Sequence, residues 1–177
     1  MLHNHNVSGV LFAKITPMKK AREADLYQIT NLYGEALTHA KNVGHIDWPD
    51  PFTLADVAQL YATNELYCFG ASALDGVARI TFHPDVRIWG ERNEKAIYLA
   101  KVATSNAVRG TRYFERVMLP DIQGTLSPRP PLRLDCVADN PGLKEFYSAI
   151  GFNELGDVTF FSEKQNRPVT VSRFEMS

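Results

Sequence analysis

A predicted strand followed at once by a short, sharply bounded helix is the feature that most constrains the fold of this chain. Residues 132–137 form a largely apolar run typical of a strand, and Asn140 and Pro141 come directly after it. Asparagine is a favoured helix N-cap, proline is favoured at the first helical position, and Gly151 can end the helix in a left-handed conformation. A strand followed directly by such a helix predicts a helix that packs on a sheet. Its packing stripe would be Leu143, Phe146, Tyr147 and Ile150.

The rest of the chain alternates between the same two kinds of element. Apolar side chains at helical spacing predict helices over residues 25–39 and 53–64 and from about 113 to 122. Pro120 should kink or end the third of these, because proline lacks an amide donor. Asp75 and Gly76 are a turn signal between two short strands, which predicts an antiparallel pair. Strand-like runs lie at 66–69, 77–82, 96–104, 132–137, 158–161 and 169–174.

Length and charge limit the number of domains and the kinds of partner. A chain of 177 residues fits one domain, and we expect a flexible lead at 1–14 and a single domain at 15–177. Because 19 Lys and Arg face 20 Asp and Glu, there is no positive field to attract nucleic acid or anionic membranes. The two cysteines, Cys68 and Cys136, lie in separate apolar runs, which favours free thiols in a reducing cytoplasm. No histidine or cysteine spacing suggests a metal site.

A more specific spacing follows the strand at 132–137. Tyr147 stands seven residues after Asn140, and Gly151 and Phe152 stand eleven and twelve residues after it. This spacing resembles the last core segment of the Gcn5-related N-acetyltransferase (GNAT) family. The resemblance implies that Asn140 helps to hold the coenzyme A arm and that Tyr147 lies beside its sulfur, where the hydroxyl can protonate the departing thiolate. A phenol with a pKa of ~10 keeps its proton at neutral pH. A tyrosine that only packs is the alternative.

A second segment, residues 98–114, resembles the family's central strand, pyrophosphate loop and following helix. In the family this strand is splayed from its neighbour, and its backbone binds the pantetheine amides. By resemblance that role falls on Val102, Ala103 and Thr104. The loop ends at a helix N-terminus, where unpaired amides and the helix dipole suit a diphosphate.

The loop itself departs from the family's pattern, which reads Arg or Gln, two residues, Gly, one residue, then Gly or Ala. Here Arg109 begins the loop, and Arg112 and Phe114 stand where the two glycines usually stand. Two solvated surface arginines are the alternative for Arg109 and Arg112. The resemblance implies coenzyme contacts from six loop residues: Arg109, Gly110, Thr111, Arg112, Tyr113 and Phe114.

With a weaker likeness that begins near Ile15, the resemblance covers nearly the whole chain. It implies an α+β fold with a central, mostly antiparallel sheet of about six to seven strands flanked by about four helices. It also implies acetyl-CoA as co-substrate and direct attack by an amine of a small molecule or a peptide, and it leaves a homodimer open. Two other hypotheses stand beside this one. The first is a catalytically degenerate binding module with an altered pyrophosphate loop, and the second is an unrelated interaction protein.

The acceptor side of the expected cleft is less well defined. An attacking amine must lose a proton, so a base or a water chain has to take it. Arg79 could bind an acceptor carboxylate or pair with a neighbouring acid. Three aromatic side chains could line an acceptor pocket or belong to the core: Trp48, Tyr67 and Trp89. Four candidates for the base are equally compatible with the spacing: Glu35, Asp47, Asp50 and His83.

Overall fold

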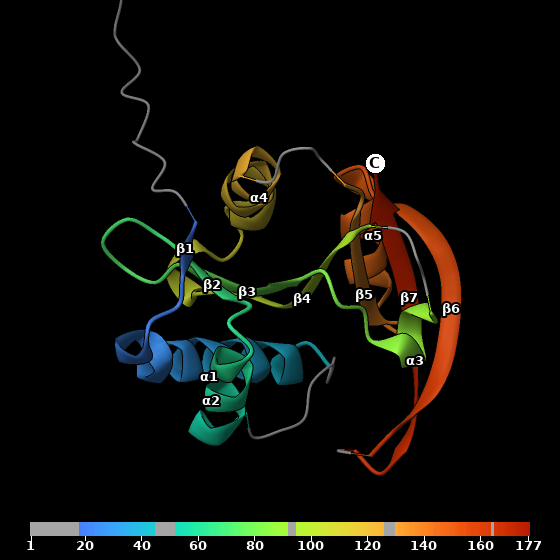
Figure 1. Ribbon diagram of the computed structural model, residues 1–177, viewed down its shortest axis with the longest axis horizontal. Helices are drawn as coiled ribbons and strands as arrows, with labels where there is room; N and C mark the ends of the chain where they lie inside the picture. Colours follow the sequence, from blue (N-terminus) through green and yellow to red (C-terminus); the bar gives the residue numbers. More distant parts are fainter. Residues whose placement is uncertain (1–17, 45–51, 92–94, 126–129, 164) are drawn as a thin grey trace, which may run out of the picture.

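A computed structural model of the chain describes residues 18–44, 52–91, 95–125, 130–163 and 165–177. The predicted lead at 1–14 therefore lies outside the described residues. The strands are β1 (Lys19–Lys20), β2 (Leu66–Phe69), β3 (Gly76–Thr81), β4 (Ile97–Thr104), β5 (Leu132–Val137), β6 (Asn153–Ser162) and β7 (Arg167–Met176). They form one sheet in the order β1-β2-β3-β4-β5-β7-β6 (Figure 1). Only β4 and β5 are parallel neighbours, so the predicted α+β class and mostly antiparallel sheet are confirmed.

Helices cover both faces of the sheet (Figure 1). The helical elements are η1 (Glu23–Asp25), α1 (Leu26–Asn42), α2 (Leu54–Ala62), α3 (Val86–Trp89), η2 (Asn106–Val108), η3 (Phe114–Met118), α4 (Leu119–Thr125) and α5 (Pro141–Ala149). Apolar side chains of α1 and α2 form one core cluster on the first face. Those of α4 and α5 form another cluster on the opposite face. The four helices that flank the sheet are the predicted ones, and the short helix α3 is an addition.

Local signals in the sequence account for where the helices begin and end. Thr53 and Asp56 form a capping box at the start of α2, in which each side chain accepts a hydrogen bond from the other residue's amide. Asn140 caps α5, because its Oδ1 accepts a hydrogen bond from the Leu143 amide at 3.0 Å. Gly151 follows α5 with a φ of 101°, the left-handed conformation that glycine adopts without strain.

The helix after the predicted loop changes its winding at the position that the sequence singled out. Its first part, η3, is a π-helical turn, and α4 begins at Leu119, directly before Pro120. Because Pro120 has no amide to donate, one regular helical hydrogen bond is missing at this point. The expected irregularity is present as a change from π to α winding just before Pro120, although the helix continues through Pro120 to Thr125.

The parallel neighbours β4 and β5 separate after only three paired residues. Their pairing ends at Leu99 and Leu134, although β4 continues to Thr104 and β5 to Val137. On the other side of β4 the register with β3 shifts, so that β4 carries one extra residue between its two pairing segments. That residue is Lys101, whose φ of 53° is left-handed. A bulge of this kind bends its strand, and the bend accompanies the separation of β4 from β5.

The bulge also changes which face of the sheet the side chains meet. Leu99 belongs to the core cluster of α4 and α5, whereas Ala103, four residues later, belongs to the cluster of α1 and α2. In a regular strand residues four apart face the same side. Tyr33 of α1 holds the irregular backbone, because its hydroxyl donates a hydrogen bond of 2.9 Å to the Lys101 carbonyl oxygen. Burial raises the pKa of Tyr33 far above its usual value, so the phenol stays protonated as a donor.

We expect Tyr33→Phe to lower the free energy of unfolding by about 1–2 kcal/mol, because the Lys101 carbonyl loses a buried donor. Urea denaturation followed by circular dichroism measures the change. Tyr27→Phe on the same helix is the matched control, since Tyr27 is 71% exposed and should tolerate the change without loss. Equal stabilities of the two variants would show that the bond at the bulge contributes nothing.

Candidate functional site

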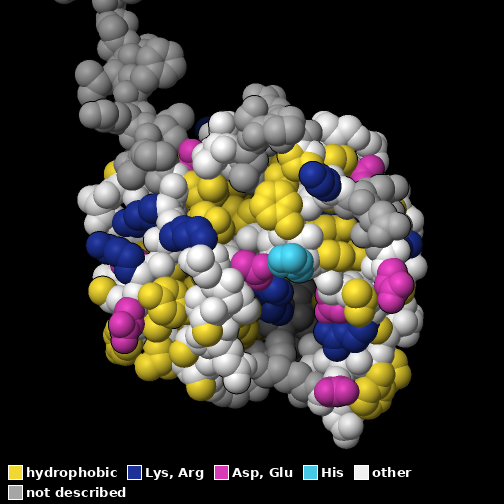
Figure 2. Space-filling view, viewed as in Figure 1, with side chains coloured by type: hydrophobic (Ala, Val, Ile, Leu, Met, Phe, Trp, Pro, Cys, Tyr) yellow, Lys and Arg dark blue, Asp and Glu magenta, His cyan; other side chains and the backbone are white. Residues whose placement is uncertain are grey.

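A cavity of about 560 Å³ opens where β4 and β5 separate. Leu37 in its wall belongs to the core cluster of α1 and α2, whereas Leu99 and Tyr147 belong to the cluster of α4 and α5. The cavity therefore passes through the sheet at the gap between the two strands. Its volume lies within the ~300–1,000 Å³ typical of small-molecule sites. Figure 2 shows this face of the molecule hollowed between the region of α1 and α2 and the region of α3 and β6, with charged side chains around the hollow.

On the α5 side, the cavity is bordered by Tyr147, whose ring packs among other aromatic rings. The ring of Tyr147 lies 6.3 Å from that of Phe114, 5.9 Å from that of Phe152 and 5.6 Å from that of Phe174, measured between centroids. Only 8% of Tyr147 is exposed, and the residue lines the cavity together with Val102 of β4. The structure thus brings together two residues that the sequence placed at the coenzyme site.

The predicted pyrophosphate loop keeps a backbone shape that normally requires glycine. Gly110 has a φ of 78°, and Arg112, which stands at a usual glycine position, has a φ of 61°. The Arg112 side chain pairs with Glu115 at 2.8 Å. The amides of Gly110, Arg112 and Tyr113 donate no hydrogen bond to another described residue. Free amides at the start of a helix form a suitable cradle for an anion such as a diphosphate.

Two loop side chains lie away from these amides. Arg109 donates a hydrogen bond to Asn106 Oδ1 and lines a second hollow of about 280 Å³ with Glu35 of α1. The ring of Phe114 is only 6% exposed and packs in the core beside Tyr147.

The other predicted coenzyme contacts also have local roles. Thr111 Oγ1 donates to the Val108 carbonyl at 2.7 Å, and burial raises the pKa of Tyr113 to about 12. Ala103 packs toward α1, Thr104 pairs with Gly76 of β3, and Asn140 caps α5. Their coenzyme contacts stay predictions.

Asp135 of β5 is a site residue that the sequence reasoning missed. It directly follows Leu134, the last residue of β5 that pairs with β4, and lines the cavity. Its side chain makes no hydrogen bond or ion pair with another described residue. Burial raises the pKa of Asp135 to about 6; Lys101 opposes this rise and Asp85 adds to it. The only signal in the sequence is an acidic residue inside the strand-like run Leu-Arg-Leu-Asp-Cys. An acid in a strand is more simply explained by a side chain that faces solvent.

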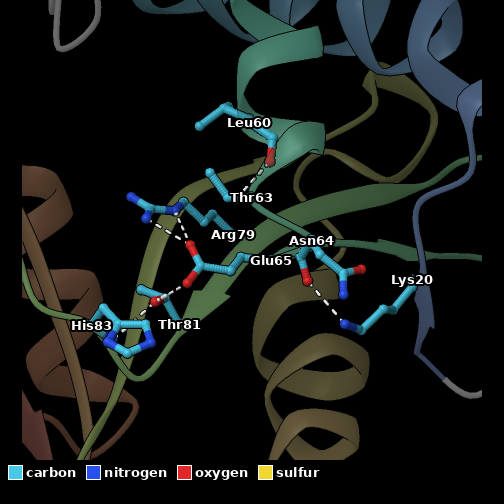
Figure 3. A network of polar contacts seen from close by, with 8 residues as sticks. All are labelled: Lys20, Leu60, Thr63, Asn64, Glu65, Arg79, Thr81 and His83. Carbon is cyan, nitrogen blue, oxygen red and sulfur yellow. Dashed lines mark hydrogen bonds and ion pairs between the residues drawn. The ribbon is translucent and has the colours of Figure 1, made fainter.

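The predicted bases lie elsewhere or outside the described residues. Glu35 Oε2 accepts a hydrogen bond of 2.9 Å from the Asn106 amide, in the second hollow. His83 joins a polar network through its backbone, since its amide donates to Thr81 Oγ1 at 3.0 Å (Figure 3). Asp47 and Asp50 lie outside the described residues.

The same network decides between the two hypotheses for Arg79. Its guanidinium donates two hydrogen bonds to Glu65 Oε2, at 2.9 and 2.6 Å, and Thr81 donates to the other oxygen of that carboxylate (Figure 3). Arg79 therefore pairs with a neighbouring acid. The network joins the start of β2 to the end of β3, and so it steadies the segment that leads to Asp85 at the cavity.

Of the aromatic candidates, Trp89 belongs to the core. It is 4% exposed and its ring lies 5.3 Å from that of Tyr98. Tyr67 lies beneath the Lys20 ammonium group, and neither Trp89 nor Tyr67 is among the described residues that line the cavity. Trp48 lies outside the described residues.

Metal-binding clusters and membrane-spanning helices are both absent from the described part of the chain. No group of three or more His, Cys, Asp or Glu side chains there could hold a metal ion. No helix within the described ranges has the length and apolar character needed to cross a bilayer. Cys68 and Cys136 are both buried, and no disulfide joins them.

Comparison with known sequences gives a partial match. No family model matches the chain. Over 74 residues the chain is 35% identical to the uncharacterized N-acetyltransferase YesJ of Bacillus subtilis (strain 168). The match covers 41% of this chain and 41% of YesJ, so it spans less than half the length of this curated relative.

Solved structures resemble the chain over nearly its whole length. A GNAT-family acetyltransferase from Listeria monocytogenes has a TM-score of 0.65 at 25% identity, covering 90% of this chain and 94% of its own. One from Streptococcus agalactiae has a TM-score of 0.70 at 16% identity, covering 92% and 97%. The structure of yncA from Salmonella typhimurium with its cofactor acetyl-CoA has a TM-score of 0.61 at 14% identity, covering 93% and 94%. Together with the sequence match and the splayed β4 and β5, these likenesses show that the chain has the fold of GNAT-family acetyltransferases and resembles one N-acetyltransferase in part of its sequence.

Proposed function

We propose that the protein is an N-acetyltransferase, which transfers the acetyl group of acetyl-CoA to an amine by direct attack. The observation that carries the proposal is the cavity at the separation of β4 and β5, with Tyr147 and Asp135 both in its wall. An acid and a base at one cavity are the two groups that this reaction needs, because a thiolate leaves and an ammonium must lose a proton. The likeness to GNAT-family acetyltransferases in fold, and to an N-acetyltransferase in part of the sequence, supports the choice of acetyl donor.

The coenzyme would approach the cavity from the C-terminal end of β4. The free amides of the loop at Gly110 and Arg112 would hold its diphosphate, and the positive charge of Arg112 would add to the attraction. The edge of β4 beyond Leu99 has no pairing to β5, so it can bind the amides of the pantetheine arm. Val102 and Leu143 would line the path of the arm into the cavity.

Tyr147 and Asp135 would divide the proton transfers between them. Asp135 accepts a proton from the bound ammonium, and the neutral amine attacks the thioester carbonyl. As the carbon–sulfur bond breaks, the Tyr147 hydroxyl protonates the sulfur that leaves, and the proton that the new amide nitrogen loses returns to the phenolate. At neutral pH a carboxyl with a pKa of about 6 is mostly ionised, so Asp135 is available as the base. Packing against Phe152 and Phe174 keeps the tyrosine ring in place for this role.

Binding of acetyl-CoA is the first test. Calorimetric titration should show a micromolar complex that Arg112→Glu weakens about 10-fold or more, because a negative charge replaces a positive one beside the diphosphate. Arg116→Glu is the matched control, since Arg116 is also exposed but lies one turn further along the helix. Absence of binding to folded protein would reject the acetyltransferase and favour the degenerate binding module.

Tyr147→Phe should lower kcat about 100-fold or more while it leaves the Kd for acetyl-CoA unchanged, because only the proton donor is removed. Release of the coenzyme thiol, followed with a thiol reagent in the presence of an amine, measures kcat. The phenylalanine ring preserves the contacts with Phe152 and Phe174, so the variant should keep its stability. An unchanged kcat would leave Tyr147 with a packing role alone.

Asp135→Asn should abolish most of the activity and also stabilise the protein. A folded-state pKa of about 6, above the ordinary 3.8, means that stability falls as the pH rises from about 4 to about 6. The neutral amide removes this loss, so at pH 7.5 the variant should gain up to about 3 kcal/mol in the free energy of unfolding. Thermal unfolding from pH 4 to 8 measures the effect.

Asp139→Asn serves as the control for this experiment, because Asp139 is exposed just beyond the end of β5. It should change neither the activity nor the pH profile of stability. A normal kcat in the Asp135→Asn variant would remove Asp135 from the mechanism. Equal pH profiles in the wild type and the variant would show that burial of the carboxylate costs nothing.

A further inference from the structure

The half of the cavity that faces α1 has largely apolar walls. Leu37 comes from α1, Ile88 from α3, Phe160 from β6 and Val171 from β7. These side chains lie on the opposite face of the sheet from the cluster that contains Tyr147. A molecule that enters on this side would place most of its surface against hydrocarbon, and polar groups buried there without partners would be costly.

The charges in the same wall have a slight negative balance. Among the described residues that line the cavity, three are acidic, namely Asp85, Asp135 and Glu163, and two are basic, namely Arg87 and Lys101. Arg87 is already engaged, because Nε lies 2.9 Å from Asp85 Oδ1 and Nη2 lies 2.5 Å from Asp85 Oδ2. Its guanidinium carbon also lies 4.9 Å from the centre of the Phe160 ring. Neither Asp135 nor Glu163 forms a side-chain hydrogen bond or ion pair with another described residue, and of these two only Glu163 is exposed.

We propose that the acyl acceptor is a small primary monoamine with an apolar remainder, whose ammonium group binds Asp135 while the remainder lies against Leu37, Ile88, Phe160 and Val171. The inference rests on the proposed acetyl transfer and adds the class of its second substrate. One positive charge would neutralise the carboxylate, and an aryl or alkyl group would fill the apolar half of the cavity.

Other amine classes fit this wall less well. An amino acid would bring a carboxylate beside Asp85 and Asp135; of the two basic groups in the wall, Arg87 is held by Asp85 and Lys101 acts on Asp135 itself. A diamine would need a second carboxylate, and of the other two in the wall Asp85 is held by Arg87 and Glu163 is exposed. A peptide N-terminus would bury amide groups against Ile88 and Val171, whose side chains offer no hydrogen-bond partner.

The inference can be tested by comparing kcat/KM for matched pairs of amines. 2-Phenylethylamine and L-phenylalanine differ only by the carboxylate, and pentylamine and cadaverine differ only by a second amino group. With acetyl-CoA as donor, we expect kcat/KM for each monoamine to exceed that of its partner about 100-fold or more, because the added charge would lie against the apolar side chains of the wall. Preference for phenylalanine, cadaverine or an alanine-terminated peptide would overturn the proposed class.

Binding without turnover provides a second readout. Protein saturated with coenzyme A should bind 2-phenylethylamine in calorimetry and should not bind L-phenylalanine at the same concentrations. If acetyl-CoA binds but no monoamine is bound or acetylated, the acceptor class is wrong and the proposed transfer is untouched. If acetyl-CoA itself fails to bind, the proposed function fails, and the acceptor inference fails with it.

Two neighbouring phenylalanines supply a matched pair of variants. Phe160→Ala should raise the KM for 2-phenylethylamine about 10-fold with little change in kcat, because it removes apolar wall and leaves the reacting groups in place. Phe161→Ala should change neither constant, since Phe161 is 54% exposed and lies outside the described cavity wall. An unchanged Kd for acetyl-CoA shows that each variant is folded. Equal KM values in both variants would exclude Phe160 from the acceptor site and overturn the assignment of the apolar wall.

Discussion

The extra residue in β4 is the constraint on which the site depends. At Lys101 the backbone leaves the regular strand, and beyond that point β4 no longer runs beside β5. A sheet closed by regular pairing would have no opening here. The Tyr33 hydroxyl bonds the Lys101 carbonyl from α1, so a helix on one face holds open a passage to the other. The cavity, the edge of β4 that has no pairing to β5 and the presence of Tyr147 and Asp135 in one cavity wall accompany this irregularity.

The opening has an energetic consequence at Asp135. A carboxylate inside the fold is poorly solvated, and burial raises its pKa toward the range in which it can exchange protons near neutral pH. The same burial destabilises the folded protein above that pKa. In the proposed reaction, catalysis and stability therefore place opposite demands on this residue, which is common where a titratable group serves a site rather than the fold.

Much of the fold could be predicted from periodicity and local signals. Strands β2 and β5 have the predicted bounds, and α5 begins at the expected cap of Asn140, because these features depend on neighbours in the sequence. Strands β6 and β7 extend beyond the predicted runs, since their outer residues pair with each other without an apolar pattern. The position of the predicted pyrophosphate loop could be inferred from the sequence, but its backbone shape could not. Arg112 adopts the left-handed conformation typical of glycine, and nothing in its side chain indicates this.

The sequence by itself determined the class of the fold, the family motif from Asn140 to Phe152 and the place of Tyr147, because caps, helical periodicity and short spacings are local properties. Only the tertiary structure decided which acid lies at the cavity. Asp135 follows a residue paired with β4, and its place in the same cavity wall as Tyr147 depends on where the two strands separate and how α5 packs behind them. Side chains from different strands and helices can line one cavity without any characteristic spacing in the sequence. Their burial and charge can be assessed only once the strands are in place.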